Sequence, residues 1–389
     1  MRILIFNYEY PPLGGGGGVV CETIAEELAR RHEIRVVTSR FGNLPREELR
    51  NGVRVLRVPV WGRTDRSVAS LRSMLTYPPS VWASALRKLQ PRSFDIVNTH
   101  FAVPTGPGSL PIAKLAGLPH VLSIHGGDIY NPAYPYAPHK LPLVRQTVSW
   151  ILRSSDAVVA QSNDTRKNAH RYYGRRDPIE VIPLGIRRPT VAPRSRAELQ
   201  LPEDAFIAVT LGRLIQRKAI DRLLRAIASE ACRNVHLVVI GDGPERPRLL
   251  EIARDLGLED RARLLGRVPE ERKWQILESA DVYVSATRHE GFGLVFLEAM
   301  SAGLPIVCPD HGGQVDFLQD GETGYLVPLE DDAALVQAIA RLEASPEEAA
   351  RMGRACRRLG EHYSADRCAG EYEDLFERLV SARSAAAPC

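Results

Sequence analysis

The feature that most constrains the fold is an alternation of short apolar runs, rich in β-branched residues, with segments of helical periodicity. In the first half of the 389-residue chain the runs cover 3–6, 34–38, 53–60, 95–97, 121–124 and 157–160. In the second half they cover 206–210, 235–240, 262–265, 282–285 and 305–308. Strands that alternate with helices at this spacing form parallel sheets with right-handed crossovers, which bind ligands at the carboxyl ends of the strands. The sequence therefore predicts an α/β fold.

The repetition of this pattern predicts two domains. A chain of 389 residues exceeds what one hydrophobic core usually covers. The stretch 187–202 is rich in Pro and Arg and lacks an apolar period, so it is the best candidate for a linker. We expect two Rossmann-like, doubly wound domains, 1–187 and 188–365, facing each other across a cleft. A final helix over 366–380 could pack on either of them.

Composition excludes several classes of protein. With 44% hydrophobic and 25% charged residues, the chain is neither disordered nor a membrane protein. Charge and proline soon follow the apolar run 3–6, so no signal peptide or spanning segment of about 20 residues is expected, and we predict a cytoplasmic location. The six cysteines lie far apart with no Cys-x-x-Cys, which favours reduced buried thiols over disulfides or a zinc site.

Charge is distributed unequally between the two halves. Residues 1–187 contain 25 Lys and Arg against 14 Asp and Glu, a net charge of +11, whereas the remainder has a net charge of −7. Opposite signs suggest separate surfaces with separate partners. The basic half shows no aromatic-basic module of the kind that binds nucleic acids, so we do not expect nucleic-acid binding.

A run of five glycines, 14–18, follows the first predicted strand. Glycines let backbone amides approach a ligand closely, and the N-terminus of the following helix favours anionic groups. The run lacks the third glycine of G-x-G-x-x-G and no Gly-Lys-Ser/Thr follows it. A flexible surface loop without a ligand is the alternative.

The second half carries two groups of candidate ligand-binding residues. Glu290 falls on a strand-to-helix loop and Glu298 within an apolar helix, where a carboxylate is costly to bury unless it binds a polar group. Glu298 could instead reach solvent at the helix edge. Arg213 and Lys218 follow the strand 206–210, where two cations can neutralise a diphosphate. A solvated basic turn is the alternative, more so for Arg217 than for Arg213.

Two further observations concern the chemistry. No Asp-x-Asp occurs in the chain, so the usual carboxylate pair for a divalent metal is missing, and we expect no metal. His125 ends the strand 121–124, where it could hydrogen-bond a sugar hydroxyl or transfer a proton. A structural histidine is the alternative, and His100 is an equal candidate on pattern alone.

Taken together, the motifs resemble those of retaining glycosyltransferases of family 4, which have the GT-B architecture. The matching segments run in order across nearly the whole chain: PPLGGGGG, SIHGGD, VIPLGI, LGRLIQRK, VVIGDGPE, EGFGLVFLEAMSAGLPIV and HGGQVDF. One departure is Ala219, which stands where the family often has glycine. The final helix would, by this resemblance, pack back on the first domain.

The resemblance implies transfer of a sugar, with retention of configuration, from a UDP- or GDP-sugar to an acceptor that is a lipid-linked or cell-surface glycan precursor. It implies no metal, no other cofactor and no protein nucleophile. The catalytic residues it implies are His125, Arg213, Lys218 and Glu290. The donor-binding residues it implies are Gly15, Gly16, Arg267, Val268, Gly291, Phe292, Gly293, Leu294 and Glu298. A nucleotide-sugar epimerase and a non-catalytic nucleotide-sugar binder are the alternatives.

The segment 61–92 predicts a weak contact with anionic membranes. It places basic residues among large apolar ones: Arg63, Arg66, Arg72, Arg87 and Lys88 with Trp61, Leu71, Met74, Tyr77 and Trp82. A solvated basic face, or an acidic soluble acceptor, would explain the same pattern. The enzyme would then be cytoplasmic with a peripheral membrane contact.

Overall fold

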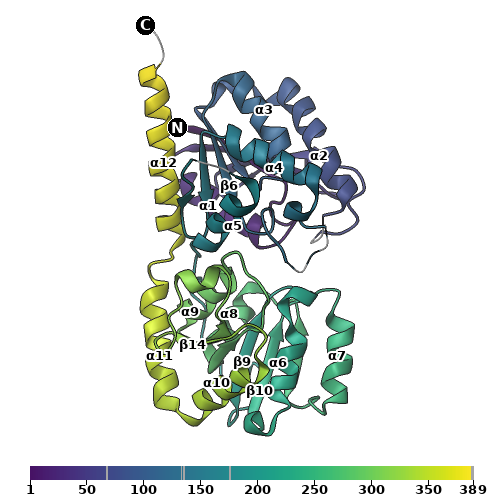
Figure 1. Ribbon diagram of the computed structural model, residues 1–389, viewed down its shortest axis with the longest axis vertical. Helices are drawn as coiled ribbons and strands as arrows, with labels where there is room; N and C mark the ends of the chain where they lie inside the picture. Colours follow the sequence, from purple (N-terminus) through teal and green to yellow (C-terminus); the bar gives the residue numbers. More distant parts are fainter. Residues whose placement is uncertain (67–68, 133, 135, 175–176, 387–389) are drawn as a thin grey trace. The chain divides into compact units, whose positions relative to one another are not determined.

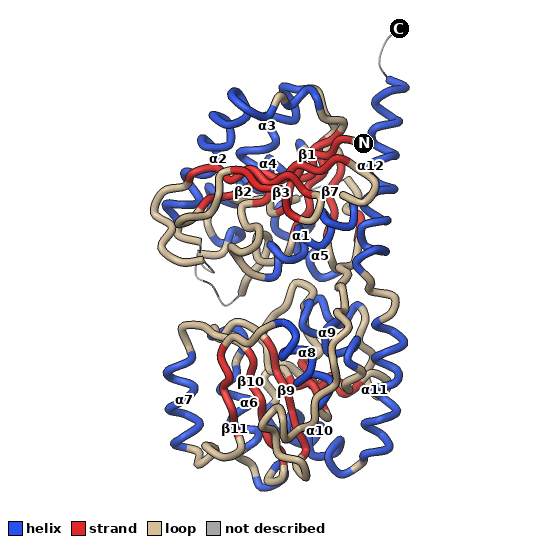
Figure 2. The backbone as a smooth tube through the Cα atoms, turned by 180° about the vertical axis from the view of Figure 1, so that it is seen from behind, coloured by secondary structure: helices blue, strands red, loops and turns tan. Residues whose placement is uncertain are grey.

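The computed structural model describes residues 1–66, 69–132, 134, 136–174 and 177–386. The chain divides into two compact units, Met1–Gly185 with Ser364–Cys389, and Ile186–Tyr363. Each unit is built on one largely parallel sheet with helices packed around it (Figures 1 and 2). The prediction of an α/β protein with two Rossmann-like domains is confirmed.

The first sheet has eight strands in the order β3-β4-β2-β1-β5-β6-β7-β8. All neighbouring strands pair in parallel except β3, which is an antiparallel edge strand. Their bounds are β1 (Arg2–Asn7), β2 (Glu33–Arg40), β3 (Glu47–Arg50), β4 (Val53–Pro59), β5 (Ile96–His100), β6 (His120–Ile124), β7 (Ala157–Ala160) and β8 (Glu180–Val181). The helices of the first unit are α1 (Gly16–Leu28), α2 (Leu71–Ser84), α3 (Gly106–Ala116), α4 (Pro142–Ser154), α5 (Asn163–Tyr173) and α12 (Ala365–Ala386).

The second sheet has six parallel strands in the order β11-β10-β9-β12-β13-β14. Their bounds are β9 (Phe206–Leu211), β10 (Val235–Ile240), β11 (Ala262–Gly266), β12 (Val282–Val284), β13 (Ile306–Pro309) and β14 (Gly324–Val327). The helices of the second unit are α6 (Ile220–Ile227), α7 (Arg246–Asp255), α8 (Glu270–Ser279), α9 (Leu294–Ala302), α10 (Asp332–Ala344) and α11 (Pro346–Gly360). Its aliphatic core is buried between the sheet and these helices.

Every strand predicted from an apolar run is present, with bounds that differ by a few residues at most. Three strands have no such run. β3 (EELR) is a charged edge strand, β8 has only two residues, and β14 is a four-residue edge strand that begins with glycine. Edge strands need less apolar surface than central ones because one side meets solvent or a loop, so their sequences carry a weaker signal.

The order of strands reverses at one point in each sheet. In the first sheet the chain moves outward from β1 to β2 and β4, then returns to β5 on the other side of β1. In the second sheet it moves from β9 to β10 and β11, then returns to β12. Loops leave in opposite directions at such a switch point, which opens a crevice at the carboxyl ends of the two strands. The loops after β1 and β5, and after β9 and β12, are therefore where ligands are expected.

The C-terminal helix α12 belongs to the first unit, where it lies beside α1 (Figure 1). Tyr372 and Phe376 on its inner face are buried. Glu373 binds the guanidinium of Arg31 at 2.5 Å and lies 2.6 Å from Nε2 of His32, and both of these residues follow α1. Apolar burial and charge pairing together hold the helix on the first unit.

Two further expectations concern cysteines and membrane spans. Cys21, Cys232, Cys308, Cys356 and Cys368 are free and buried, and Cys389 lies outside the described residues. Among the helices that the structure describes, none combines the length and the apolar character needed to cross a bilayer.

Candidate functional site

The loop after β9 holds its shape through glycine and backbone contacts. Gly212 has a φ of +140°, and its missing side chain leaves room for the stem of Lys218, which would lie about 3.1 Å from an added Cβ. Backbone hydrogen bonds join the loop to the one after β10, from Gly212 N–H to the Ile240 carbonyl and from Leu214 N–H to the Asp242 carbonyl, each 3.0 Å long. The loop thereby places Lys218 near the carboxyl end of β9.

Ala219 ends the short 3-10 turn Gln216–Lys218 and begins α6. It has a φ of +49° and is almost fully buried. The left-handed region is costly for any residue with a Cβ, so this geometry explains why glycine suits the position better.

Glu290 lies at the centre of a buried charge cluster. Its carboxylate is 2.5 Å from Nζ of Lys218 and 3.3 Å from Nη1 of Arg217, and it accepts a hydrogen bond of 3.2 Å from the Thr287 hydroxyl. Burial alone would raise the pKa of Glu290, but the two cations outweigh burial and lower it to about 2. The cluster has two positive charges and one negative charge, so it retains net positive charge for an anionic ligand.

Arg217, which was not predicted as a site residue, belongs to this cluster. Its carbonyl accepts a hydrogen bond from Arg288 N–H at 2.9 Å, and its guanidinium contacts the His289 carbonyl as well as Glu290. It is therefore part of the cluster and not a solvated turn. Arg213 lies half-buried on the same loop. The only sequence signal for Arg217 was its position beside Lys218.

The loop 290–293 leads directly into α9. Gly293 occupies the N-cap position with a φ of +93°, where an added Cβ would meet the Phe296 ring. The Glu290 carbonyl accepts a 2.8 Å hydrogen bond from Gly313 N–H, which ties this loop to the one after β13. The N-terminus of α9 therefore lies beside the charge cluster at the switch point, where its free amides favour an anion.

The side chain of Phe292 packs in the core of the second unit. Its side chain is buried, with its ring 4.9 Å from that of Phe317 and 6.2 Å from that of Tyr363. Because the ring is part of the core, only the backbone of Phe292 can line a ligand site. Gly291 and Leu294, on either side of Phe292 and Gly293, are partly exposed.

Glu298 projects from α9 toward α8. It binds Nζ of Lys273 at 2.8 Å, and its side chain is 19% exposed. Burial raises the pKa of Glu298, and Lys273 opposes that rise. Arg267 and Val268 lie on the loop between β11 and α8, so the loop expected near the nucleobase leads into the helix that contacts Glu298. Lys273 was not predicted as a site residue, because nothing in the sequence indicates that α8 packs beside α9.

In the first unit the glycine loop joins β1 to α1. An added Cβ at Gly17 would overlap the Phe101 ring, and one at Gly18 would crowd the Glu9 carbonyl, so these two glycines are required by packing. Gly15 and Gly16 are exposed, and no atom lies within 4 Å of where a Cβ on Gly15 would be. Packing therefore does not explain Gly15, whose N–H donates a 3.2 Å hydrogen bond to the Glu9 carboxylate.

One carboxylate forms hydrogen bonds with the backbone of both the loop after β5 and the loop after β6. Asp128 accepts hydrogen bonds from Ala102 N–H at 2.7 Å and from His125 N–H at 2.9 Å. Burial raises the pKa of Asp128 to about 6, although these backbone donors oppose the rise. His125 is partly exposed, whereas His100 is fully buried beside it. The two histidines that the sequence could not separate are thus neighbours with different access to solvent.

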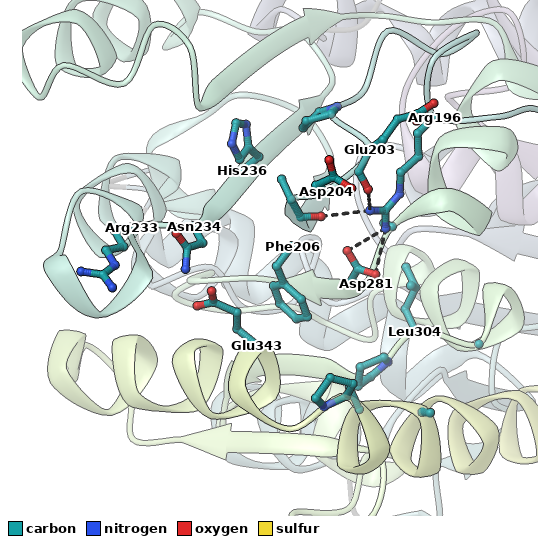
Figure 3. Close-up of a pocket in the computed structure, with 18 residues that line it drawn as sticks. Arg196, Glu203, Asp204, Phe206, Arg233, Asn234, His236, Asp281, Leu304 and Glu343 are labelled. Atoms are coloured by element: carbon teal, nitrogen blue, oxygen red, sulfur yellow. Dashed lines mark hydrogen bonds and ion pairs between the residues drawn. The ribbon is translucent and has the colours of Figure 1, made fainter.

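A pocket of about 930 Å³ lies elsewhere in the second unit, at the amino ends of the strands (Figure 3). Its lining includes Phe206 and His236 at the start of their strands and Glu343 on α10. Inside it, Arg196 forms a bidentate ion pair with Asp281 at 2.8 and 2.9 Å and donates to the carbonyls of Glu203 and Ala205. This arginine fastens the segment before β9 to the domain. The pocket is at the opposite edge of the sheet from the charge cluster, so it is not part of the candidate site.

Comparisons with known proteins agree with this arrangement. The family models for glycosyltransferase family 4 and for glycosyl transferases group 1 match residues 14–188 and 191–359, respectively. A GDP-mannose-dependent α-(1-6)-phosphatidylinositol monomannoside mannosyltransferase of Mycolicibacterium smegmatis is 28% identical over 383 residues, with 94% of each chain covered. An N-acetyl-α-D-glucosaminyl L-malate synthase of Bacillus anthracis is 26% identical, with 97% of each chain covered.

Solved structures share the fold. The sucrose-phosphate synthase of Thermosynechococcus elongatus superposes with a TM-score of 0.85 at 22% identity, covering 98% of this chain and 99% of that one. HepE of Anabaena, in complex with UDP, gives a TM-score of 0.77 at 18% identity, covering 97% and 100%. With the family models and the full-length relatives, these matches show that the chain belongs to glycosyltransferase family 4 and is a glycosyltransferase of GT-B fold.

Proposed function

We propose that the second unit binds a nucleoside diphosphate sugar through the loops after β9 and β12. The observation that carries this proposal is the buried cluster of Arg217, Lys218 and Glu290 beside the N-terminus of α9. Two cations and a set of helix amides at one switch point suit a diphosphate. Arg213 on the same loop would add a further cation. HepE, whose structure contains UDP, supports a nucleotide ligand for this fold.

Two glutamates are proposed to contact the ribose and the transferred sugar of the donor. Glu298 would accept hydrogen bonds from ribose hydroxyls, near a base held by the backbone of Arg267 and Val268. Glu290 would contact the transferred sugar, with Gly291, Gly293 and Leu294 lining the sugar and phosphates. UDP and GDP both remain candidates, because a GDP-mannose-dependent enzyme and a UDP complex occur among the similar proteins.

For the chemistry we propose transfer with retention of configuration and without a divalent metal. As the bond from the sugar to the diphosphate breaks, negative charge grows on the departing phosphate, where Lys218 and the arginines of its loop would stabilise it. A phosphate oxygen held on that face can accept the proton of the incoming hydroxyl, so no protein nucleophile is needed. Gly15, Gly16 and His125 would be the first unit's contributions to donor binding and transfer.

The acceptor is proposed to be a lipid-linked or cell-surface glycan precursor that carries negative charge. Residues 1–187 have a net charge of +11, which suits such a molecule. The similar proteins include enzymes named for phosphatidylinositol monomannoside and for lipopolysaccharide core biosynthesis. Neither an epimerase nor a non-catalytic binder is favoured, because the curated relatives are glycosyltransferases.

The donor is identified first by thermal stabilisation. UDP-glucose, UDP-N-acetylglucosamine and GDP-mannose are tested at 1 mM, since a ligand that binds only the folded state raises the melting temperature. The stabilising donor is then incubated with candidate acceptors, and nucleotide release and the anomeric configuration of the product are measured. Absence of stabilisation by every nucleotide sugar, or an inverted product, would contradict the proposal.

We also propose a peripheral membrane contact through α2, in a cytoplasmic enzyme. Leu71, Leu75 and Trp82 form a stripe along one face of this helix and are 72%, 68% and 44% exposed. Trp61 and the basic residues Arg66, Arg72 and Arg87 are exposed in the same segment. Arg63 and Tyr77 are buried, which removes them from the predicted contact, and Lys88 lies outside the described side chains.

Co-sedimentation with vesicles tests this contact. Leu71→Ser with Leu75→Ser should reduce binding to vesicles of phosphatidylglycerol and phosphatidylcholine. Leu49→Ser is the matched control, because Leu49 is as exposed as Leu71 but lies on edge strand β3. No binding of the unsubstituted protein at low salt, or equal loss in both variants, would refute the contact.

A further inference from the structure

His100 and His125 form a hydrogen-bonded pair at the carboxyl ends of two adjacent strands. His100 is the last residue of β5 and His125 follows β6, and the parallel register of these strands sets His100 opposite Ser123. Nδ1 of His100 lies 2.9 Å from Nε2 of His125. The two rings are nearly parallel, with centroids 5.1 Å apart and an angle of 14° between their planes.

At neutral pH each ring of the pair carries one proton, and one of these two protons lies in the hydrogen bond between the rings. Burial lowers the pKa of His125 to about 4 and lowers the pKa of His100 well below its usual value, so neither ring is charged. Two nitrogens at hydrogen-bonding distance then need one N–H donor and one acceptor. Two arrangements satisfy this requirement, and they differ in which ring donates.

The surroundings of His100 favour one of them. Its Nε2 is buried and has no hydrogen-bond partner among the described residues. If the proton were on Nε2, a buried N–H would be left without an acceptor, which is rarer and costlier in proteins than an unused acceptor. The proton therefore belongs on Nδ1, where it is donated to His125.

We propose that His100 is a positioning residue: it donates from Nδ1 to Nε2 of His125 and fixes His125 as the neutral tautomer protonated at Nδ1. The basic nitrogen of His125 is then occupied, so this ring can donate a hydrogen bond to a sugar oxygen but does not act as a general base. The link to sugar transfer depends on the proposed function, whereas the tautomer does not.

The C-terminal helix α12 packs against His100 of this pair. The Tyr372 ring of α12 lies 6.4 Å from the His100 ring at 24°. Its hydroxyl donates to the Ser123 hydroxyl at 3.0 Å, which also accepts a 2.9 Å hydrogen bond from the Asn98 amide. On the other side the Phe101 ring contacts His125 at 4.7 Å, with Phe101 held at a φ of +70°. His100 is thus enclosed, and its orientation is set by elements far apart in sequence.

The tautomer is read directly by long-range ¹H–¹⁵N correlation spectra of the full chain labelled with ¹⁵N-histidine. His125 is assigned with His125→Gln. We expect a protonated Nδ1 and an unprotonated Nε2, both unchanged between pH 5.5 and 8. In His100→Leu, the signals of His125 should show a mixture of tautomers, whereas His100→Asn should retain the original one, because an amide can donate from the same place.

His120 is the internal control. It is buried on β6 and bonded to Thr99 and Ser155, so its signals should be the same in all variants. Protonation of Nε2 of His125 in the unsubstituted protein would overturn the proposal, and so would an unchanged His125 spectrum in His100→Leu. If His100→Leu does not fold, the spectrum of the unsubstituted protein and that of His100→Asn still decide the question.

Kinetics separate positioning from structure. With the donor that stabilises the protein, kcat for nucleotide release should fall on the order of 10- to 100-fold in His100→Leu, because misplacement of a group near the reacting atoms costs that much. The KM for the donor should change less than about twofold, and His100→Asn should recover most of kcat. If KM rose on the order of 10- to 100-fold while kcat stayed unchanged, the positioning role of His100 would be refuted. If the spectra agree but no nucleotide sugar binds, the proposed function fails and the tautomer assignment stands.

Discussion

The charge cluster around Glu290 makes the stability of the second unit depend on pH in a calculable way. The pKa of Glu290 is about 2 in the folded protein, against an ordinary value of 4.5. The gap between these values corresponds to roughly 3 kcal/mol of stability at pH 7. A carboxyl group whose pKa is lowered by folding stabilises the protein fully at pH values above its pKa in the unfolded chain. This stabilisation is lost as the pH falls toward its pKa in the folded protein. At pH 3 roughly 1.4 kcal/mol should remain.

Glu290→Gln tests this magnitude, because glutamine resembles the protonated acid. The variant should be less stable than the unsubstituted protein by about 3 kcal/mol at pH 7, and the difference should shrink to about half that at pH 3. Glu322→Gln is the control, since Glu322 is exposed and lies away from the cluster. It should show little difference at either pH.

The assay must report on the second unit alone, because two domains need not unfold together. Trp274 is the one tryptophan within Ile186–Tyr363 and is buried on α8. With Trp61, Trp82 and Trp150 replaced by phenylalanine, fluorescence in a urea titration follows that unit. A difference between the variant and its parent that does not change with pH, or no difference at pH 7, would refute the reasoning about the cluster.

Four further outcomes follow. Glu298→Ala should weaken binding of the stabilising nucleotide sugar more than about tenfold by calorimetry, which corresponds to the loss of a charged hydrogen bond, and unchanged affinity would remove Glu298 from the ribose site. Gly293→Ala should destabilise the second unit by about 1–3 kcal/mol because its φ is positive, whereas Ala219→Gly should stabilise it by up to about 1 kcal/mol for the same reason; urea titration measures both, and a reversed order would contradict the backbone argument. Phe376→Ala should cost the first unit about 3–5 kcal/mol, seen as a lower melting temperature, and a shift as small as that of an exposed substitution would show that α12 is not docked. Nucleotide release should be unchanged in 5 mM EDTA, and loss of activity that manganese restores would refute metal independence.

Sequence periodicity predicted the strands and the division into two domains. A parallel strand is buried on both faces, so its sequence is a continuous apolar run that can be recognised. Sequence periodicity also predicted that Glu290, Lys218 and His125 lie at carboxyl ends, since this depends only on where each strand stops. It did not predict that Arg217 shares Glu290 with Lys218, or that Lys273 reaches Glu298. Those pairs depend on how loops and helices pack, and pairs far apart along the chain leave no periodic signal.

The choice between His100 and His125 illustrates the same limit. Each histidine is at the end of an apolar run, so pattern alone treats them as equal. In the folded unit, Tyr372 of the last helix helps to enclose His100. His125 lies one residue beyond its strand and remains partly exposed. Exposure decides which ring can reach a ligand, and it arises from a contact between residues more than 200 positions apart, which no local pattern contains.

Two residues with strained backbones lie at the carboxyl edges of the sheets, next to candidate site residues. Among the described residues, six that are not glycine have a positive φ, and the two apolar ones are Phe101 and Ala219. Phe101 follows β5 and contacts His125, whereas Ala219 follows Lys218 and begins α6. Such conformations cost of order 1–3 kcal/mol each and persist where the surrounding structure enforces them, often at functional sites. The pocket at the amino edge of the second sheet includes no such residue in its lining. Strain, buried charge and the reversal of strand order thus coincide at the same loops, although each arises from a different part of the sequence.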